Sequence, residues 1–183
     1  MPRRIGRARP EHRLGSCPDR TRTGICAARP VTDFKMVSLD EAVRRFMETH
    51  HAAAMITLRA DGTPHAVRVG VALVGGRLWS SGTKSRVRTR NLRSDPRCTL
   101  FMWEQGYGSL TLETMVTIHE GPDVPEMSIR LFQTMQAGMD RGPRPGYLIW
   151  NGVERSLDEF RGIMVEERRL IYEFEVQRSS GLR

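Results

Sequence analysis

From residue 54 onward, hydrophobic and polar residues alternate with a period of two in several stretches, which predicts β-strands. These stretches cover residues 54–59, 67–74, 77–81, 97–104, 110–119 and 170–177. Such alternation places every second side chain on one face of a strand, as in a sheet with one buried face. The pairs Asp61-Gly62 and Gly75-Gly76 predict tight turns. We therefore expect the first three strands to form an antiparallel meander.

Two capping boxes mark the starts of helices. They are Ser38-Leu-Asp-Glu41 and Ser156-Leu-Asp-Glu159, and apolar residues at helical spacing follow each of them. In such a box the serine hydroxyl accepts a bond from the amide three residues on, and the glutamate returns one. A third helix is expected from Asp123 to near Gly138, with Pro125 in its first turn.

Two further segments separate these elements. Asp95-Pro96 predicts the end of a short helix, because a residue before proline is disfavoured in helical geometry. Residues 141–152 are rich in Gly and Pro and are expected to form a loop.

Antiparallel strands with few helices predict a mainly β, α+β fold: a small closed or split antiparallel β-barrel with short covering helices. A parallel α/β architecture is not expected. Strands do not alternate regularly with crossover helices, and no Gly-x-Gly-x-x-Gly follows a strand.

Positive charge is concentrated at the N-terminus. The 183 residues carry a formal charge of +8, but residues 1–35 hold nine of the 29 Lys and Arg and three of the 21 acids. The remainder, with 20 bases and 18 acids, is nearly neutral. We expect residues 1–35 to be a disordered basic tail, read through from a start codon upstream of a natural start at Met36, and residues 36–183 to be one domain. Nucleic-acid binding through the tail is the less favoured interpretation.

Cysteine and histidine form no recognisable metal or disulfide pattern. The three Cys residues and five His residues are scattered, so no metal site is expected. No run approaches the ~20 apolar residues of a membrane span, and we expect a cytoplasmic protein.

Residues 80–96 are the main local excess of positive charge in the nearly neutral part. Lys84, Arg86, Arg88 and Arg90 stand where a strand is expected to turn into a short helix. A helix N-terminus already carries roughly half a positive charge and unpaired amides, so cations stacked there indicate a bound anion. For Arg90, a solvated helix face is the favoured alternative.

Three segments taken together resemble a known family. They are residues 57–65 (Thr-Leu-Arg-Ala-Asp-Gly-Thr-Pro-His), residues 76–78 (Gly-Arg-Leu) and residues 88–97 (Arg-Thr-Arg-Asn-Leu-Arg-Ser-Asp-Pro-Arg). Their order and spacing resemble the FMN-binding split β-barrel superfamily of pyridoxamine 5′-phosphate oxidase-like proteins. Within it, they are most similar to the actinobacterial oxidoreductases that use the deazaflavin coenzyme F-420.

The resemblance implies an intertwined homodimer with a cofactor cleft at each interface. It places the cofactor ring against the strand that enters the basic segment and against the strand before it. The phosphate then lies on the basic residues that follow. The implied cofactor-binding residues are Val67, Arg68, Val69, Ser80, Ser81, Thr83, Lys84, Arg86 and Arg88. FMN would be held by the same residues, so only the resemblance favours the deazaflavin.

The implied function is hydride transfer between reduced coenzyme F-420 and an unsaturated small-molecule acceptor. An FMN-dependent oxidoreductase, or a non-catalytic protein that binds a flavin or tetrapyrrole, is the alternative. The catalytic residues stay unknown; Tyr147, Tyr107 and His65 are candidate proton donors. The chain ends without the Arg-x-His element of true pyridoxamine phosphate oxidases, which speaks against vitamin B6 chemistry. The loop over residues 139–155 is longer than the resemblance implies.

Overall fold

The computed structural model describes residues 40–182. They form a seven-stranded antiparallel sheet, a separate two-stranded hairpin and four helices. The elements in chain order are α1 (Glu41–Thr49), β1 (Ala52–Leu58), β2 (Pro64–Gly70), β3 (Ala72–Val74), β4 (Arg77–Thr83), α2 (Val87–Ser94), β5 (Arg97–Trp103), β6 (Ser109–His119), α3 (Val124–Gln136), β7 (Tyr147–Trp150), β8 (Val153–Ser156), α4 (Leu157–Glu166) and β9 (Arg169–Ser180). The predicted tail, residues 1–35, lies outside the described residues.

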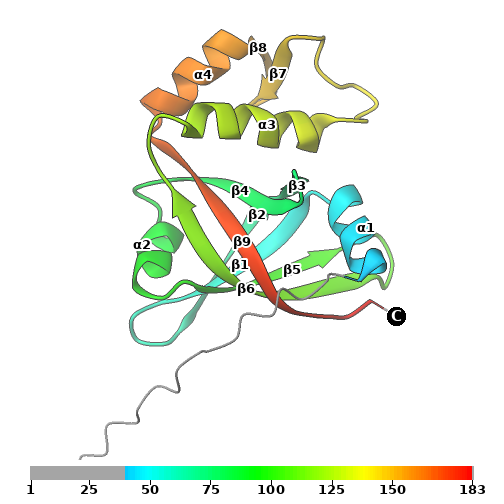
Figure 1. Cartoon of the computed structure of the whole chain (residues 1–183), viewed down its shortest axis with the longest axis vertical. Coiled ribbons are helices and arrows are strands. Elements are labelled where there is room, and N and C mark those ends of the chain that lie inside the picture. The colour runs from blue at the N-terminus through cyan, green and yellow to red at the C-terminus, as the bar shows by residue number, and fades with distance from the viewer. Residues whose placement is uncertain (1–39, 183) are drawn as a thin grey trace, which may run out of the picture. The chain divides into compact units, whose positions relative to one another are not determined.

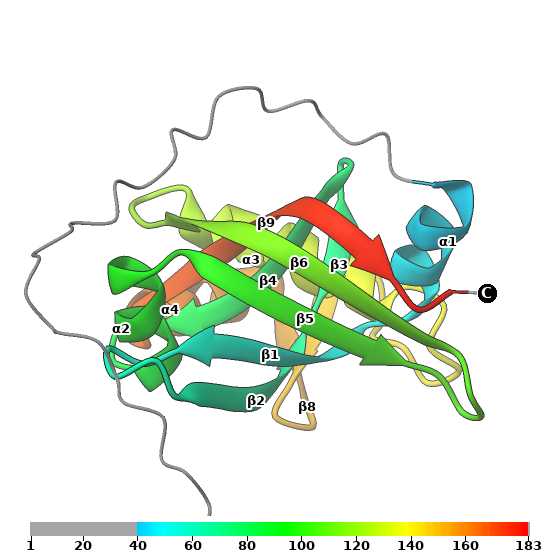
Figure 2. The same ribbon diagram turned by 90° about the horizontal axis from the view of Figure 1, so that it is seen from below.

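The large sheet curls into a split barrel. Its strand order is β2-β1-β5-β6-β9-β4-β3, so β2 and β3 stand at opposite edges. Only Val71 separates these two strands in sequence, and the chain therefore joins the two edges of the sheet. Figure 2 shows β2, β1, β5, β6 and β9 side by side, with β4 and β3 beyond them. The mainly β split-barrel prediction is confirmed.

The predicted three-strand meander is wrong in one respect. Residues 67–74 form two strands, because β2 pairs with β1 whereas β3 pairs with β4. Val71 carries no ladder position; its amide bonds to the carbonyl of His51. The alternating pattern continues across this bend because both strands face the same interior, and so periodicity alone does not reveal the change of partner.

The barrel interior holds the main hydrophobic core. Inward residues alternate with outward ones along the strands, as in β1, where Ala53, Met55 and Thr57 are buried and the residues between them are half-buried. The largest fully buried side chains of this core include Met47, Met55, Leu100, Met102, Leu110, Leu112, Leu170 and Tyr172. Val43, Phe46 and Met47 of α1 pack into the same core. Burial of each such side chain stabilises the fold by about 1.5–3 kcal/mol.

Outside the barrel, α3 is the centre of a second layer. One side of α3 packs through Leu131 on Trp79 and Ile171 of the sheet. Its other side packs through Ile129 on Leu148 and Phe160, which belong to β7 and α4. Figure 1 shows α3 between the barrel and the α4, β7 and β8 elements.

Two predicted helix starts and one predicted loop can be compared with the structure. Asp40 is the N-cap of α1 and accepts a bond from the amide of Ala42, whereas the predicted cap, Ser38, lies outside the described residues. The capping box at Ser156 is confirmed, with both reciprocal bonds to Glu159 present. The loop prediction for residues 141–152 is wrong in its second half, because β7 lies there and pairs with β8.

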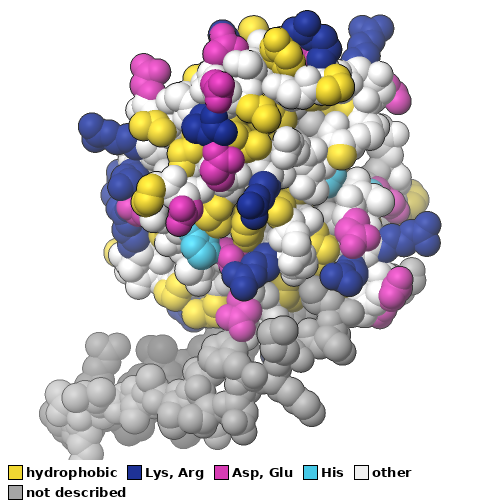
Figure 3. Space-filling view, turned by 45° about the horizontal axis from the view of Figure 1, so that its top comes forward, with side chains coloured by type: hydrophobic (Ala, Val, Ile, Leu, Met, Phe, Trp, Pro, Cys, Tyr) yellow, Lys and Arg dark blue, Asp and Glu magenta, His cyan; other side chains and the backbone are white. Residues whose placement is uncertain are grey.

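The described surface mixes charges of both signs. Figure 3 shows basic and acidic side chains interspersed over one face rather than gathered into a single field. None of the four helices between residues 40 and 182 has the length and hydrophobicity that a bilayer crossing requires.

Candidate cofactor site

The connection from β4 to α2 leaves a helix N-terminus without acidic compensation. β4 ends at Thr83, and Arg86 is the N-cap of α2 in an extended conformation. No side chain caps the helix, and its first turn contains no acidic residue. The first amides of a helix have no intrahelical partner and carry partial positive charge. This end of α2 therefore favours an anion.

Next to this helix end, the sheet has unpaired edges. Residues 80–83 of β4 pair with β9 on one side, whereas β3 pairs only with residues 77–79 on the other. β2 pairs only with β1 within the described part of the chain. The strands β2 and β4 contact each other without sharing a ladder. We call this boundary the seam; backbone groups of both strands are left there without strand partners.

Buried hydrogen bonds fix α2 against the barrel. The Thr89 hydroxyl donates to the carbonyl of Thr83 (2.7 Å) and lies 2.6 Å from the hydroxyl of Tyr172. The Asn91 amide donates to the hydroxyl of Thr57 on β1 (3.0 Å). Such satisfied buried bonds make the position of α2 rigid relative to the seam.

Three buried polar atoms at this place have no hydrogen-bond partner within residues 40–182. They are the hydroxyls of Ser80 and Ser81 and the Nε of Arg88. The Nη2 of Arg88 lies 3.5 Å from the carbonyl oxygen of Ser81, a long contact. Buried polar groups are nearly always hydrogen-bonded, so an unpartnered buried donor such as the Arg88 Nε fits a ligand with acceptors at the start of α2. Arg88 lies in the first turn of α2, so its Nε is the one of the three atoms that adjoins the helix N-terminus.

The other two predicted phosphate-binding cations differ in their partners. The Nζ of Lys84 lies 2.9 Å from Glu120, which also pairs with Arg93. Hydrogen bonds from Lys84 and then Arg93 lower the pKa of Glu120, so this carboxylate stays ionised. Arg86 is exposed and forms no ion pair with any described residue. Arg86 and Arg88 thus keep their charge uncompensated by a carboxylate.

The three predicted residues on β2 do not share one face. Val69 is buried and Val67 half-buried against the barrel core, whereas Arg68 between them is exposed. What the three have in common is the backbone edge of β2 that has no strand partner among the described residues. Ser80 and Ser81 likewise point to opposite faces of β4.

The candidate proton donors are dispersed. Tyr107 is fully exposed in the β5–β6 turn, and Tyr147 lies on β7, where the Arg144 guanidinium stacks 4.2 Å from its ring centre. His65 alone of the three belongs to a strand of the seam. Its Nδ1 is buried and has no partner among the described residues.

The sequence patterns did not predict the contacts by which Tyr172 holds β4 and α2 in place. Gly82 lies against the ring of Tyr172, and Tyr172 anchors Thr89. The alternation of the last strand predicts that Tyr172 is buried, but only the three-dimensional structure shows what its hydroxyl contacts.

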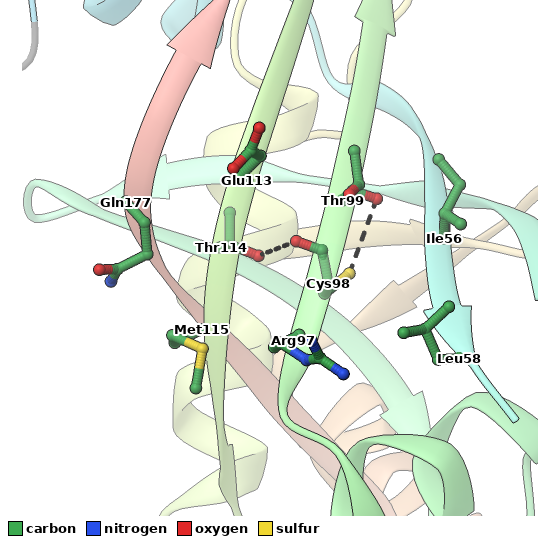
Figure 4. A pocket seen from close by; sticks show the side chains of 9 residues that line it. All are labelled: Ile56, Leu58, Arg97, Cys98, Thr99, Glu113, Thr114, Met115 and Gln177. Carbon is green, nitrogen blue, oxygen red and sulfur yellow. Dashed lines mark hydrogen bonds between the residues drawn. The ribbon is translucent and has the colours of Figure 1, made fainter. Parts of the chain in front are cut away.

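A separate cavity of about 340 Å³ lies on the outer face of β1, β5, β6 and β9. Figure 4 shows Ile56, Leu58 and Met115 around it, with Arg97, Glu113 and Gln177 as its charged or amide groups. The Thr114 hydroxyl donates to the carbonyl of Cys98 (2.9 Å). Between residues 40 and 182, no three His, Cys, Asp or Glu side chains come together as a metal site would require.

We predict that Cys98 is unreactive in the folded protein. Burial raises the pKa of its thiol to about 12, so almost no thiolate forms near neutral pH. Alkylation with iodoacetamide at pH 8 followed by peptide mapping is expected to leave Cys98 unmodified in native protein and to modify it in urea. Modification of native protein at the rate of a free thiol would contradict this prediction.

The sequence of residues 39–147 matches the family model described as pyridoxamine 5′-phosphate oxidase. The chain belongs to the pyridoxamine 5′-phosphate oxidase family. The match includes the seam, α2 and most of the candidate site, and it ends at the start of β7. The resemblance seen in the sequence is therefore confirmed at the level of the family. No curated protein matches the sequence.

Solved structures similar to this oxidase-family domain share the fold at low identity. An F420 reductase is 18% identical, with a TM-score of 0.56, over 78% of this chain and 99% of its own. A conserved hypothetical protein from Mycobacterium tuberculosis is 18% identical (TM-score 0.57), over 79% of this chain and 85% of its own. The heme storage protein HutZ from Vibrio cholerae is 13% identical (TM-score 0.55), over 79% and 94% respectively.

Proposed function

We propose that this chain is an oxidoreductase that uses reduced coenzyme F-420 to transfer hydride to an unsaturated small-molecule acceptor. The observation that carries the proposal is the start of α2 beside the seam, where the first turn holds no acidic residue and the buried Nε of Arg88 has no partner among residues 40–182. Membership of a flavin-binding family and the similarity to an F420 reductase support it. FMN is the alternative cofactor, because its phosphate suits the same cations.

In this proposal, the cofactor lies along the seam with its phosphate on the first turn of α2. Backbone groups of residues 67–69 and 80–83 contact the ring of the cofactor. Thr83 and Lys84 lie between the ring and the phosphate. Arg86 and Arg88 hold the phosphate; the planar fork of a guanidinium can donate two parallel bonds to its oxygens. When bound, the deazaflavin supplies the hydride at its C5, and the protein supplies orientation and a dry surface.

His65 is the proton donor that we favour among the three candidates. It stands on β2 with a buried Nδ1 that has no described partner, whereas Tyr107 and Tyr147 lie on the β5–β6 turn and β7. A proton donor must come within hydrogen-bond reach of the reacting atom, directly or through one water. Because His65 lies on a strand of the seam, it is placed to reach a substrate bound against the cofactor there.

A side-by-side titration tests the cofactor. Full-length protein is titrated with coenzyme F-420 and with FMN while the fluorescence of each cofactor is followed, and turnover is then measured with reduced F-420 and a quinone or enone. We expect tighter binding of F-420 and steady turnover. Tighter FMN binding with flavin-dependent turnover would replace the deazaflavin assignment. Binding of neither cofactor would refute the proposal.

The non-catalytic alternative is a flavin- or tetrapyrrole-binding protein. The similarity to a heme storage protein and the unpartnered Nδ1 of His65 are the observations in its favour. An absorbance titration with hemin separates the two functions. A sharp Soret band that disappears in His65→Ala, together with no F-420 turnover, would favour the alternative.

We also propose that the protein is a homodimer in which the outer face of β1, β5 and β6 is buried. Phe101 and Trp103 on β5 expose 39% and 44% of their surfaces and stack with ring centres 6.0 Å apart. The cavity of about 340 Å³ with Ile56 and Met115 extends the same face. Large exposed aromatic side chains of this kind mark protein interfaces.

The dimer prediction concerns Phe101 and Trp103. Two buried carboxylates would oppose association, so Phe101→Glu/Trp103→Glu is expected to yield a folded monomer. Light scattering after size-exclusion chromatography measures the mass, and circular dichroism checks the fold. The control, Tyr107→Glu, changes the fully exposed β5–β6 turn. A wild-type protein that elutes as a monomer at micromolar concentration would contradict the proposal.

A further inference from the structure

A second cleft, of about 670 Å³, lies between the first turn of α3 and the turn that joins α4 to β9. Its lining includes Lys84, Val124, Pro125, Met164, Val165 and Arg168. A volume of this size is typical of small-molecule sites. Its lining is apolar in the middle and basic at the rim.

The apolar part includes an exposed side chain that the fold does not explain. Val124, Pro125 and Met164 are buried, but Val165 leaves 63% of its surface exposed. Single exposed apolar residues are common on convex surfaces. Here the valine adjoins buried apolar neighbours in a concave site, which an apolar ligand would cover.

Most of the cations of the cleft already have carboxylate partners. Lys84 pairs with Glu120, and Arg161 pairs with Glu126 and Asp158. Glu126 is the single carboxylate among the residues that line the cleft.

Arg169 is likewise engaged. It pairs with Glu167 (2.6 Å), and its guanidinium lies 4.6 Å from the ring centre of Trp150. Arg168 differs from these cations, since it forms no ion pair with any residue from 40 to 182. One guanidinium at the rim therefore remains available to a ligand.

The backbone conformation of Arg168 is unusual for a residue other than glycine. Its φ is +50°, in the left-handed region, and its amide bonds to the carbonyl of Val165 (3.0 Å) just after α4 ends. Glycine is the usual residue at this position after a helix because it adopts that conformation without steric cost. The chain thus places a cation where glycine would be less strained. The negative end of the helix dipole also favours a cation there.

We propose that this cleft binds an amphipathic carboxylate. The carboxylate lies against Arg168 and the rim near Lys84, and the apolar body of the ligand covers Val165, Val124 and Pro125. The cleft lies beside the β4–α2 turn on the β9 side of β4, because Lys84 belongs to that turn and Arg169 of β9 is the cross-strand partner of Thr83. The site is separate from the proposed cofactor site, and this proposal does not rest on the proposed function.

Calorimetry of the full-length protein without cofactor tests the site directly. The probes are 2-naphthoate, its neutral amide and inorganic phosphate. We expect 2-naphthoate to bind at least tenfold more tightly than the amide, and phosphate not to displace it. Equal binding of acid and amide, or displacement by phosphate at comparable concentration, would overturn the proposal. Because no cofactor is present, failure of F-420 binding does not affect this result.

Substitutions then locate the binding. Arg168→Gly is expected to weaken 2-naphthoate binding about tenfold or more while the melting temperature stays equal or rises, because backbone strain is relieved. Arg168→Lys keeps the charge beside the helix end and is expected to keep most of the affinity. Val165→Ser should weaken binding severalfold. Arg45→Gln, at an exposed position of α1, is the control for the loss of one positive charge. Wild-type affinity in Arg168→Gly, or an equal loss in Arg45→Gln, would refute the assignment.

Discussion

Arg88→Ala is expected to weaken cofactor binding by more than tenfold. The Arg88 Nε is buried without a described partner, and its guanidinium approaches the Ser81 carbonyl at the free edge of β4. A charge-assisted hydrogen bond of this kind contributes about 1.5–3 kcal/mol, and every 1.4 kcal/mol is a factor of ten in the dissociation constant. Fluorescence titration with coenzyme F-420 and with FMN measures the loss.

Two companion variants make the result specific to Arg88. Arg90→Ala removes an exposed arginine from the same helix. In the described part of the chain its guanidinium bonds only to the carbonyl of Ser85 (3.3 Å), so the variant is expected to bind nearly as the wild type does. Arg88→Lys keeps the charge but loses the planar fork, so an intermediate affinity is expected. If Arg88→Ala titrates like the wild type while its circular dichroism is unchanged, the phosphate is not held by Arg88.

The fold was largely predictable because its strands are half-buried. Strands with one buried face show a clear period of two, and the turn pair Asp61-Gly62 and the capping box at Ser156 act locally. The change of partner at Val71 was not predictable. The pairing of β3 with β4 is a local hairpin across Gly75-Gly76, but the point at which the chain leaves its pairing with β1 depends on how the sheet curls.

The hairpin of β7 and β8 was missed although its sequence carries a signal. Asn151-Gly152 is the turn pair most typical of a two-residue hairpin, and both residues have positive φ (51° and 80°). The Gly and Pro content of residues 141–152 favoured a loop and outweighed that signal. Four-residue strands give too little alternation to correct the error.

The candidate site, like the fold, was predictable from the sequence only in part. The basic segment and its place before a helix were readable, because charge and helix starts are local features. The pairing of Lys84 with Glu120 was not, since 36 positions separate the two residues in the sequence. The buried hydroxyls of Ser80 and Ser81 were named only through the resemblance, and the structure adds that they have no hydrogen-bond partner among residues 40–182.

Gly82→Ala is expected to be the most destabilising small substitution near the site. Gly82 is buried in β4, and a Cβ added there would lie 2.6 Å from the ring Cζ of Tyr172 and still closer to its hydroxyl oxygen. Tyr172 is fully buried and bonded to Thr89, so it cannot move aside without breaking the anchor of α2. Overpacking of this kind costs about 1–3 kcal/mol, occasionally more.

Thermal unfolding followed by circular dichroism measures this cost, at about 2–4 °C per kcal/mol for a domain of this size. Gly162→Ala is the matched control, because Gly162 lies within α4 and nothing stands within 4 Å of an added Cβ. Replacing a helical glycine by alanine stabilises by about 0.5–1 kcal/mol, so the two glycine variants should shift the melting temperature in opposite directions. Because the Gly82 contact also fixes Thr89 and hence α2, a Gly82→Ala protein that still folds should bind cofactor less tightly. An unchanged melting temperature in Gly82→Ala would show that Tyr172 packs differently, and the support assigned to α2 would then be wrong.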